Sequence, residues 1–386
     1  MTINNEHKKL NVPNLRFPEF SGEWEEFGLS ELLDFKNGLN PKPDKFGKGI
    51  KFISVMDILN NAVITYDCIK ASVDVTEKEL SDFSVEKGDM LFQRSSETLE
   101  DVGRANVYMD DKTAVFGGFV IRGKKKGEYD PQYFNYLLRS PFARKRIIPM
   151  GAGAQHFNIG QEGLSKVKLH FANIEEQNKI GKMLSLLDER ISIQSKIIDK
   201  LQSLIKGIRN DVFGKLRKNI GFNAVVGDVL DYEQPQSYII EDTEYTNEGT
   251  PVLTANKAFV LGYTLETDGI YDKGDCIIFD DFTLDCKYVD FPFKVKSSAI
   301  KILTAKNKEL LHYTFEFLKY LDLSTEEHKR HYIAQTQNQE FILPTEQMVK
   351  TIAHIFSILS LRMETAVKQR DEFEKQKQYL LRQMFI

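Results

Sequence analysis

The sequence predicts an α+β fold: two similar mixed α/β domains, joined and separated by two long coiled-coil helices with pseudo-two-fold symmetry. Three observations predict this fold. Two helical stretches match each other without a gap at an offset of 172 positions, as Ile180 matches Ile352 and Phe213 matches Phe385 (352 − 180 and 385 − 213). Both stretches carry apolar residues at heptad spacing, and the mixed segments before them share short motifs. A duplicated unit accounts for all three.

The chain opens with a polar leader, residues 1–20. Residues 21–172 form the first mixed domain, because short β-branched and aromatic runs such as 50–55 and 114–122 alternate with Gly and Pro turns. A helix is predicted over 132–139, since the preceding Pro131 suits the first turn of a helix.

The first long helix is predicted over 173–217 and the second over 344–386. In the first, only Gln194 interrupts the apolar stripe; in the second, Arg370 and Lys377 interrupt it. Such stripes pack lengthwise on another helix, and each copy is the other's natural partner. About 34 helical residues would span roughly 50 Å at 1.5 Å each. The predicted helix–helix seam consists of Ile180, Leu184, Leu187, Ile191, Ile198, Leu201, Ile205, Ile352, Phe356, Leu359, Met363, Phe373 and Leu380.

The second mixed domain, residues 218–343, is predicted to be a shortened relative of the first. Leu33-Asp34-Phe35 resembles Leu230-Asp231-Tyr232, and Lys87-Gly88-Asp89 resembles Lys273-Gly274-Asp275. Their offsets fall from 197 (230 − 33) to 186 (273 − 87), approaching the 172 of the helices. This steady decrease of the offset predicts that the two mixed domains share one fold and differ in the lengths of their loops. Because a Lys-Gly-Asp turn before an apolar strand is a common structural turn, we assign it to the fold and not to chemistry.

Composition excludes several classes of protein. With 386 residues, 41% of them hydrophobic, the chain can bury two or three cores, and its three cysteines are too few for a disulfide framework. No signal-peptide pattern opens the sequence, and no run approaches the roughly 20 apolar residues of a membrane helix, so we expect a cytoplasmic location. The net charge of −4 disfavours a broadly basic surface, although Arg144-Lys145-Arg146 and similar clusters are locally basic.

No catalytic motif is found. The GxxxxGK[ST] phosphate loop and the glycine-rich dinucleotide fingerprint are absent, and no histidine lies in HExxH. Asp130-Pro131-Gln132-Tyr133 is similar to an amino-methyltransferase motif but lacks its second proline, and it is better explained as a helix start. The sequence therefore predicts a chain without catalytic residues, metal ligands or a cofactor of its own.

Two signatures accompany this order of parts. Glu-Gln segments introduce the long helices, as Ile174-Glu175-Glu176-Gln177 and Thr345-Glu346-Gln347, and the leader contains Leu15-Arg16-Phe17-Pro18-Glu19-Phe20 followed by Gly22 and Trp24. Over essentially its whole length the chain resembles the specificity (S) subunit of type I restriction-modification systems. The second copy departs from the pattern: Ser360 stands where the first has Asp188, and its Glu-Gln segment is shorter.

The resemblance implies that the two mixed domains are target-recognition domains, each reading one half of a bipartite DNA sequence. It implies that the two long helices pair antiparallel, set the spacer between the half-sites and dock the methyltransferase subunits. The implied partners are double-stranded DNA, two modification (M) subunits and two restriction (R) subunits, with no membrane. S-adenosylmethionine, ATP and Mg²⁺ are expected in the partner subunits, so that this chain is the non-catalytic recognition subunit of a multisubunit methyltransferase and endonuclease.

Candidate reading residues follow from the chemistry of base edges, which Arg, Lys, Asn and Gln recognise best. In the first domain, polar residues after the apolar strand 90–92 and a loop after Gly151-Ala152-Gly153 are candidates, with nearby lysines for the phosphate backbone. An ordinary surface loop explains any one of them equally well. These candidates are Gln93, Arg94, Ser95, Ser96, Arg104, Gln155, His156, Asn158, Lys42, Lys45 and Lys48.

In the second domain, the equivalent loop contains Asp280-Asp281, whose carboxylates can accept from cytosine amino groups but which we expect to be solvated. Its neighbours and two further loops supply the other candidates. These are Thr283, Lys287, Thr254, Asn256, Lys257, His331, Gln335, Gln337 and Asn338.

Two alternatives stay open. A single-chain DNA methyltransferase or nuclease that uses the same recognition domains would methylate or cut DNA alone, and it requires a catalytic motif. A coiled-coil assembly protein without DNA contact would leave the methylation pattern unchanged when deleted.

Overall fold

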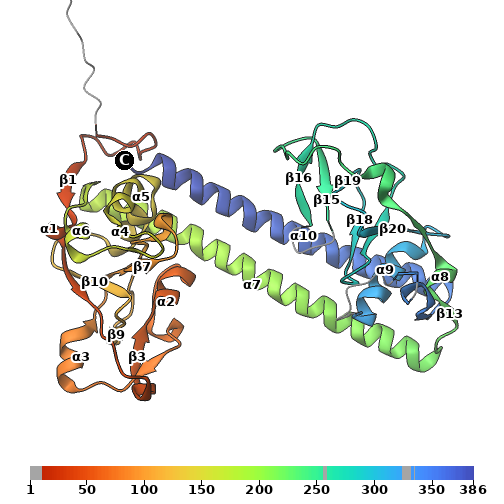
Figure 1. Cartoon of the computed structure of the whole chain (residues 1–386), viewed down its shortest axis with the longest axis horizontal. Helices are drawn as coiled ribbons and strands as arrows, with labels where there is room; N and C mark the ends of the chain where they lie inside the picture. The colour runs from red at the N-terminus through yellow and green to blue at the C-terminus, as the bar shows by residue number, and fades with distance from the viewer. Residues whose placement is uncertain (1–10, 255–258, 324–331, 334) are drawn as a thin grey trace, which may run out of the picture. The chain divides into compact units, whose positions relative to one another are not determined.

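The computed structural model describes residues 11–254, 259–323, 332–333 and 335–386 (Figure 1). The chain forms two compact units: unit 1 consists of Met1–Gln194 and Gln369–Ile386, and unit 2 of Ser195–Lys368. Each unit has its own sheets and core. The long helices α7 (Ile174–Asn219) and α10 (Glu346–Gln383) each contribute one part to unit 1 and one to unit 2.

Unit 1 is built on an antiparallel sheet in the order β2-β10-β6-β8. Its strands are β2 (Leu33–Asn37), β10 (Val120–Lys125), β6 (Met90–Gln93) and β8 (Ala105–Val107). A second sheet runs β4 (Ser72–Val73), β3 (Phe46–Ile53), β9 (Ala114–Phe116), β5 (Ser84–Val85), with β3 and β9 parallel. Two short pairs are β1 (Glu25–Gly28) with β12 (Lys168–Phe171), and β7 (Ser95–Ser96) with β11 (Phe157–Asn158). The short helices are α1 (Leu29–Leu32), α2 (Val55–Asn60), α3 (Glu77–Phe83), α4 (Pro131–Arg139), α5 (Pro141–Ile147) and α6 (Gln161–Ser165).

Unit 2 repeats this topology. Its main sheet runs β14 (Leu230–Glu233), β20 (Ile300–Ala305), β17 (Cys276–Asp280), β18 (Cys286–Val289), which is the same order of equivalent strands. Its second sheet runs β16 (Val260–Thr264), β15 (Thr250–Leu253), β19 (Lys294–Val295), and it too contains one parallel pair, β15 with β19. The remaining elements are the β13 (Ala224–Val225) and β21 (Glu340–Phe341) pair, α8 (Val226–Val229) and α9 (Leu310–Leu321). The prediction of two similar mixed domains is confirmed.

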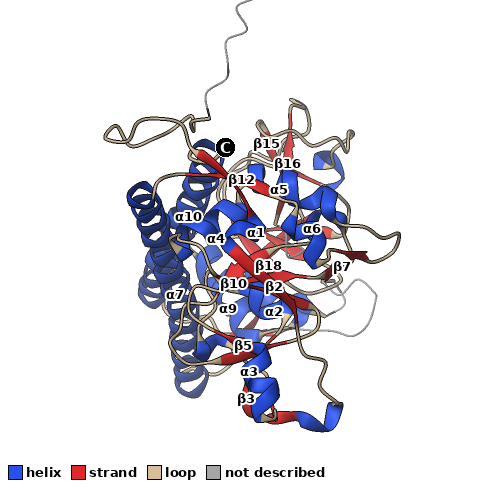
Figure 2. Cartoon of the chain, turned by 90° about the vertical axis from the view of Figure 1, so that its left-hand side faces the viewer, coloured by secondary structure: helices blue, strands red, loops and turns tan. Residues whose placement is uncertain are grey.

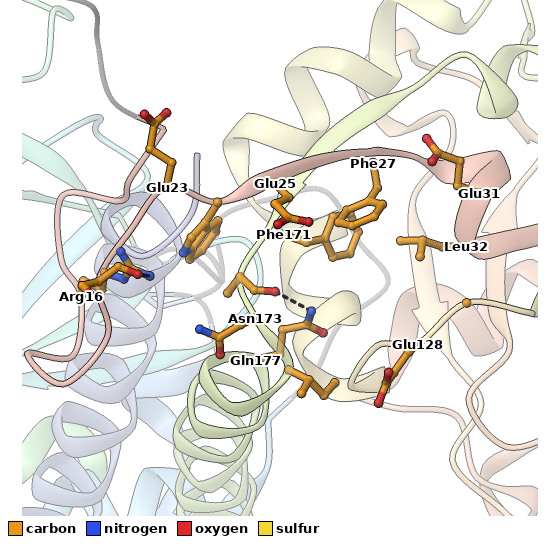
Figure 3. Close-up of a pocket in the computed structure, with 15 residues that line it drawn as sticks. Arg16, Glu23, Glu25, Phe27, Glu31, Leu32, Glu128, Phe171, Asn173 and Gln177 are labelled. Atoms are coloured by element: carbon orange, nitrogen blue, oxygen red, sulfur yellow. Dashed lines mark hydrogen bonds between the residues drawn. The ribbon is translucent and has the colours of Figure 1, made fainter.

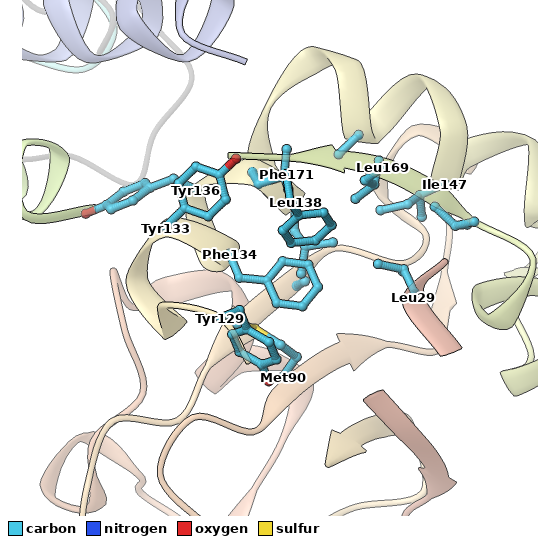
Figure 4. Close-up of a cluster of buried hydrophobic side chains, with 14 of the residues drawn as sticks. Leu29, Met90, Tyr129, Tyr133, Phe134, Tyr136, Leu138, Ile147, Leu169 and Phe171 are labelled. Atoms are coloured by element: carbon cyan, nitrogen blue, oxygen red, sulfur yellow. The ribbon is translucent and has the colours of Figure 1, made fainter. Parts of the chain in front are cut away.

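The helix expected at 132–139 is α4. Asp130 caps it by accepting a hydrogen bond from the Tyr133 backbone N–H at 2.7 Å, and Pro131 occupies the first turn. Its buried face enters the core of unit 1, where Phe134 packs edge-on against Tyr129 and Phe171 (Figure 4). The run 114–122 forms two strands, β9 and β10, because Gly117-Gly118 turns the chain between them.

In unit 1, α7 and α10 pair antiparallel. Asp188 of α7 pairs with Lys377 of α10, and Gln194 of α7 pairs with Gln369 of α10. The residue numbers of the paired side chains increase along α7 and decrease along α10. In Figure 2, α4 lies between this helix pair and the strands of unit 1, and the Tyr136 hydroxyl donates to Asp188 at 2.6 Å. Two of the polar interruptions, Gln194 and Lys377, are therefore satisfied by polar groups of the facing helix, which fixes the register of the pair.

In unit 2, the same two helices pack on α9. Phe213 of α7 is fully buried and stacks against Tyr320 and Phe356. Arg209 forms an ion pair with Glu316 of α9 at 2.7 Å, and both side chains are largely removed from water. Burial raises the pKa of the Glu316 carboxyl, and Arg209 acts in the opposite direction.

The substitution Arg209→Ala is expected to destabilise unit 2 by about 3–5 kcal/mol, because it leaves Glu316 buried without its cation. The pKa of Glu316 then rises further above its unfolded value. A carboxyl that binds its proton more tightly in the native state loses stability as pH rises, so the deficit should shrink as pH falls. Urea unfolding at pH 5 and pH 8 measures this.

The matched control is Lys215→Ala on the same helix, because Lys215 forms an exposed pair with Asp211. It should cost less than about 0.5 kcal/mol at either pH. A deficit of Arg209→Ala that is equal at the two pH values would contradict the assignment to Glu316.

The leader is anchored to unit 1 over its described part. Arg16 forms an ion pair at 2.7 Å with Glu176, which is fully buried and also accepts from the Trp24 indole. Trp24 packs edge-on against Phe385 near the end of the chain, and the Leu15 N–H donates to the Gln383 carbonyl. Residues 15–24 thus meet residues 383–385 near the first turn of α7.

Among the helices of the described residues, none is both long and apolar enough to cross a membrane.

Candidate nucleic-acid interface

The two main sheets present equivalent loops. β6 and β17 occupy the same place in their sheets, and their last residues, Gln93 and Asp280, pair with the first residues of β10 and β20. Each is preceded by the Lys-Gly-Asp turn, whose Gly88 and Gly274 have φ of +94° and +93°. Glycine suits such a left-handed turn because a side chain strains it. The repeated motif shapes the strand entry, and the loop after the strand is free to differ.

In unit 1 the structure brings together the two loops that were predicted separately. β7, directly after β6, pairs with β11, so that Ser96 lies opposite Phe157 and Ser95 opposite Asn158. The Ser95 hydroxyl donates to the Asn158 side chain. Gln155 and His156 are exposed in the same loop. These residues form one surface, here called the first reading surface (Arg94–Ser96 with Gln155–Asn158).

The candidates differ in their access to solvent. Gln93 is 5% exposed, and its side-chain N–H donates to the Ser95 carbonyl, so it lies beneath the loop. Arg94 is half-buried and donates to the Gly118 carbonyl at 3.3 Å. Arg104 is exposed and pairs with Asp101. Direct contact with a base is therefore easiest for Arg94, the two serines and the Gln155–Asn158 loop, and all of these remain predictions.

The predicted lysines lie at and near the start of β3. Lys45 and Lys48 share one carboxylate, Asp74, at 3.3 and 3.6 Å, and together they lower the pKa of that carboxyl. Lys42 is exposed at the preceding short 3-10 helix. The three lysines stand beside two carboxylates, Asp74 and the exposed Asp44, and their ammonium groups are accessible for contact with phosphates.

In unit 2 the acidic pair is buried, so the expectation that Asp280 and Asp281 are solvated is wrong. Asp280 caps the turn after β17 by accepting from the Phe282 and Thr283 N–H groups. Asp281 pairs with Lys301 at 3.3 Å, and each side chain is 1% exposed. Burying a charge is costly unless an opposite charge compensates it, and here Lys301 compensates Asp281. The ion pair therefore fixes the position of the loop that follows β17.

The other second-domain candidates divide into three groups. Thr283 is exposed at the tip of the β17 loop, and Lys287 pairs with Asp285 at 3.3 Å. Thr254 is half-buried, while Asn256, Lys257 and His331 lie outside the described residues. The segment Gln335–Asn338 follows Tyr332, whose N–H donates to Asp281, and thus lies beside the β17 loop. We call Thr283 with Gln335, Gln337 and Asn338 the second reading surface.

The predicted seam residues are buried or half-buried, and several of them pack into the cores of the two units: Ile180, Leu184 and Leu380 in unit 1, and Ile205, Ile352, Phe356 and Leu359 in unit 2. Ile180, Leu184, Leu187, Ile198, Ile352 and Phe356 are buried, and Ile191, Leu201, Ile205, Leu359, Met363, Phe373 and Leu380 are half-buried. Other apolar residues of these helices face solvent. Leu186, Ile193, Ile197 and Leu204 on α7 and Ile355, Ile358 and Leu361 on α10 are exposed.

A cavity of about 570 Å³ in unit 1 is unsuited to DNA (Figure 3). Glu23, Glu25, Glu31 and Glu128 surround it, and Arg16, the cation that lines it, is paired with Glu176. Carboxylates repel phosphates, so we do not include this region in the candidate interface.

Sequence reasoning missed an apolar surface beside the first reading surface. Phe119 and Met56 are 68% and 60% exposed and line a groove of about 400 Å³ with Phe46. The Arg94 N–H donates to the Phe119 carbonyl, so Phe119 adjoins the reading loop. Apolar side chains contact the thymine methyl group in the major groove. The signal in the sequence was Gly117-Gly118-Phe119, which places an aromatic residue on a turn between apolar strands.

The chain is similar to known proteins in its sequence and in its fold. Residues 21–203 match the family model of the type I restriction modification DNA specificity domain. The type I restriction enzyme EcoR124I/EcoR124II specificity subunit of Escherichia coli is 44% identical over 126 residues, or 31% of each chain. The putative type I restriction enzyme MjaX specificity subunit of Methanocaldococcus jannaschii is 26% identical over 214 residues, or 54% of this chain and 50% of that one. The chain thus matches half or less of the length of these relatives.

Among solved structures, the S subunit of a type I restriction-modification system from M. genitalium has the same fold. The TM-score is 0.68 at 16% identity, over 97% of this chain and 99% of that one.

Proposed function

From the premise that this chain belongs, through residues 21–203, to the family of type I restriction-modification specificity subunits, we propose that it selects the DNA sequence on which such a complex acts. Each recognition domain reads one half of a bipartite target. The first reading surface serves one half-site and the second reading surface the other.

One observation carries the proposal. Units 1 and 2 share the strand order of the main sheet, yet the equivalent loops carry unlike side chains, Arg94-Ser95-Ser96 after β6 and Asp281-Phe282-Thr283 after β17. Base readout depends on donors and acceptors at the loop, while the sheet only positions them. Equivalent loops with different chemistry are what an asymmetric two-part target requires.

The long helices supply the surface for partners in this proposal. Exposed apolar residues recur on α7 at heptad-related positions, with Leu186 and Ile193 seven residues apart, and again Ile197 and Leu204. A solvent-facing apolar stripe on a helix favours association with another protein. We assign these stripes to two modification subunits, with two restriction subunits joining the assembly.

Catalysis belongs to the partners in this proposal. The chain carries no recognisable catalytic motif, so S-adenosylmethionine, ATP and Mg²⁺ are bound by the modification and restriction subunits. Because the target is cellular DNA, the proposed site of action is the cytoplasm.

A genome-wide methylation map, made with and without this gene, tests the proposal. We expect one asymmetric bipartite methylated sequence to disappear when the gene is deleted and to return with the intact gene. The purified chain alone should neither methylate nor cut DNA. An unchanged map, or methylation by the chain alone, would contradict the proposed role.

A further inference from the structure

A second cavity in unit 1, of about 410 Å³, is strongly cationic. Arg104, Arg139 and Arg144 line it, on the loop before β8, the end of α4 and α5. Glu100 is the one carboxylate among its described lining residues, and Gln378 of α10 closes one side. The cavity therefore gathers three guanidinium groups beside Glu100, while Asp101, outside the lining, pairs with Arg104 at 2.6 Å.

The two inner arginines are held by neutral groups. Arg139 donates to the carbonyl oxygens of Ala105 and Asn61, and Arg144 donates to those of Gly103, Glu100 and Val102 at 2.6–2.9 Å. A guanidinium has five N–H donors, so these bonds orient each group and leave donors unused. Carbonyl oxygens fix the two side chains without neutralising their charge.

Burial and neighbouring charges both act on the two inner arginines. Burial, together with the neighbouring charge of Arg104, lowers the pKa of Arg144 to about 10. Burial also lowers the pKa of Arg139, and the carboxylate that opposes this, Asp188, is already paired with Lys377 and Tyr136. An anion in the cavity would relieve both effects.

The backbone segment that carries Arg104 is hydrogen-bonded to Gln93, the residue directly before the first reading surface. The Gln93 N–H donates to the Arg104 carbonyl at 2.7 Å, and the Gly103 N–H donates to the Gln93 carbonyl at 2.9 Å. Arg144 in turn holds the Gly103 carbonyl. A group bound by these arginines is therefore held at a fixed position relative to the loop that begins at Gln93.

We propose that Arg104, Arg139 and Arg144 form a binding site for a phosphate group of the DNA backbone, which sets the register of the duplex on the first reading surface. The inference rests on the proposed function and adds a positioning site to it. Planar guanidinium groups match the oxygens of a phosphate in paired hydrogen bonds, and such contacts position DNA without reading its sequence.

The test measures DNA binding by the complete complex of this chain with its modification subunits, for wild type and Arg144→Gln. We expect the variant to bind target and unrelated DNA about tenfold or more weakly. The slope of log affinity against log salt should fall by about 1, and the methylated sequence should stay the same. Arg144→Lys should restore part of the affinity.

The matched control is Lys145→Gln, an exposed residue of the same helix that does not line the cavity. It removes the same charge and should leave the affinity near that of wild type. If Arg144→Gln fails to assemble, Arg104→Gln replaces it, because that side chain is about half exposed and its loss leaves the core intact.

Neutral methylphosphonate groups, placed one at a time along the target, identify the source of the anion. One position should weaken wild type and leave Arg144→Gln unaffected. Uniform sensitivity in both proteins, or an unchanged salt slope, would overturn the site. Thermal stabilisation of wild type by inorganic phosphate, without any sensitive backbone position, would assign the cavity to a free anion and also overturn it. Failure of wild type to bind its target would instead contradict the proposed function.

Discussion

Replacing residues 21–172 with the corresponding domain of another specificity subunit is expected to change one half of the methylated sequence completely and to leave the other half unchanged. The reason is that the first reading surface and its supporting sheet belong to unit 1, while the second reading surface belongs to unit 2. A methylation map of cells carrying the chimaera measures both halves at once.

The chimaera must keep the contacts that tie this domain to the long helices. Tyr136 donates to Asp188 of α7, and the Asp130 N–H donates to Gln177. The domain used for the exchange should therefore have a tyrosine equivalent to Tyr136 and a free backbone N–H at the position equivalent to Asp130. The reciprocal exchange of residues 218–343 serves as the control and should change only the other half. A change in both halves, or in neither, from the first exchange would contradict the assignment of domains, whose borders remain predictions.

Inserting one heptad into each long helix is expected to lengthen the unspecified spacer of the target by about three base pairs. Seven helical residues add roughly 10 Å at 1.5 Å each, and the rise of duplex DNA is about 3.4 Å per base pair. The insertions belong after Gln194 and after Lys368. The hydrogen bond between Gln194 and Gln369 shows that these positions face each other, so both helices lengthen at the same level.

A seven-residue insertion preserves the heptad spacing of the seam on either side. The control inserts two residues at the same two positions, which rotates the seam by about 200° away from its partner and should abolish methylation instead of moving it. Methylation maps of the two variants distinguish the outcomes. An unchanged spacer in the heptad variant would refute the role of the helices as a ruler.

The helices illustrate how far periodicity carries a prediction. The observed bounds, Ile174–Asn219 and Glu346–Gln383, differ from the predicted 173–217 and 344–386 by three residues or fewer, because a sustained apolar stripe determines a helix locally. The same pattern marked Gln194 and Lys377 only as interruptions. Their pairing with Gln369 and Asp188 depends on which residues of a distant segment lie opposite them.

The loops illustrate where such prediction ends. Asp280 and Asp281 look like a solvated acidic pair in the sequence, yet one caps a turn and the other is buried against Lys301, which lies 20 residues further along the chain (301 − 281). The first reading surface joins Ser95 to Asn158 through a strand pair, and the arginine cavity gathers side chains from a loop and two helices. The local sequence around each of these residues carries no information about which distant residues it contacts.

The sequence by itself determined the duplication, the two long helices, the two domains of one fold and the absence of recognisable catalytic motifs, because repeats and periodicity are written along the chain. The tertiary structure alone decided which loops form a surface, which charges are buried, and that the leader's Arg16 and Trp24 meet Glu176 at the start of α7. The physical reason is that burial and pairing are properties of neighbours in space, and in this chain the decisive neighbours lie tens to hundreds of residues apart.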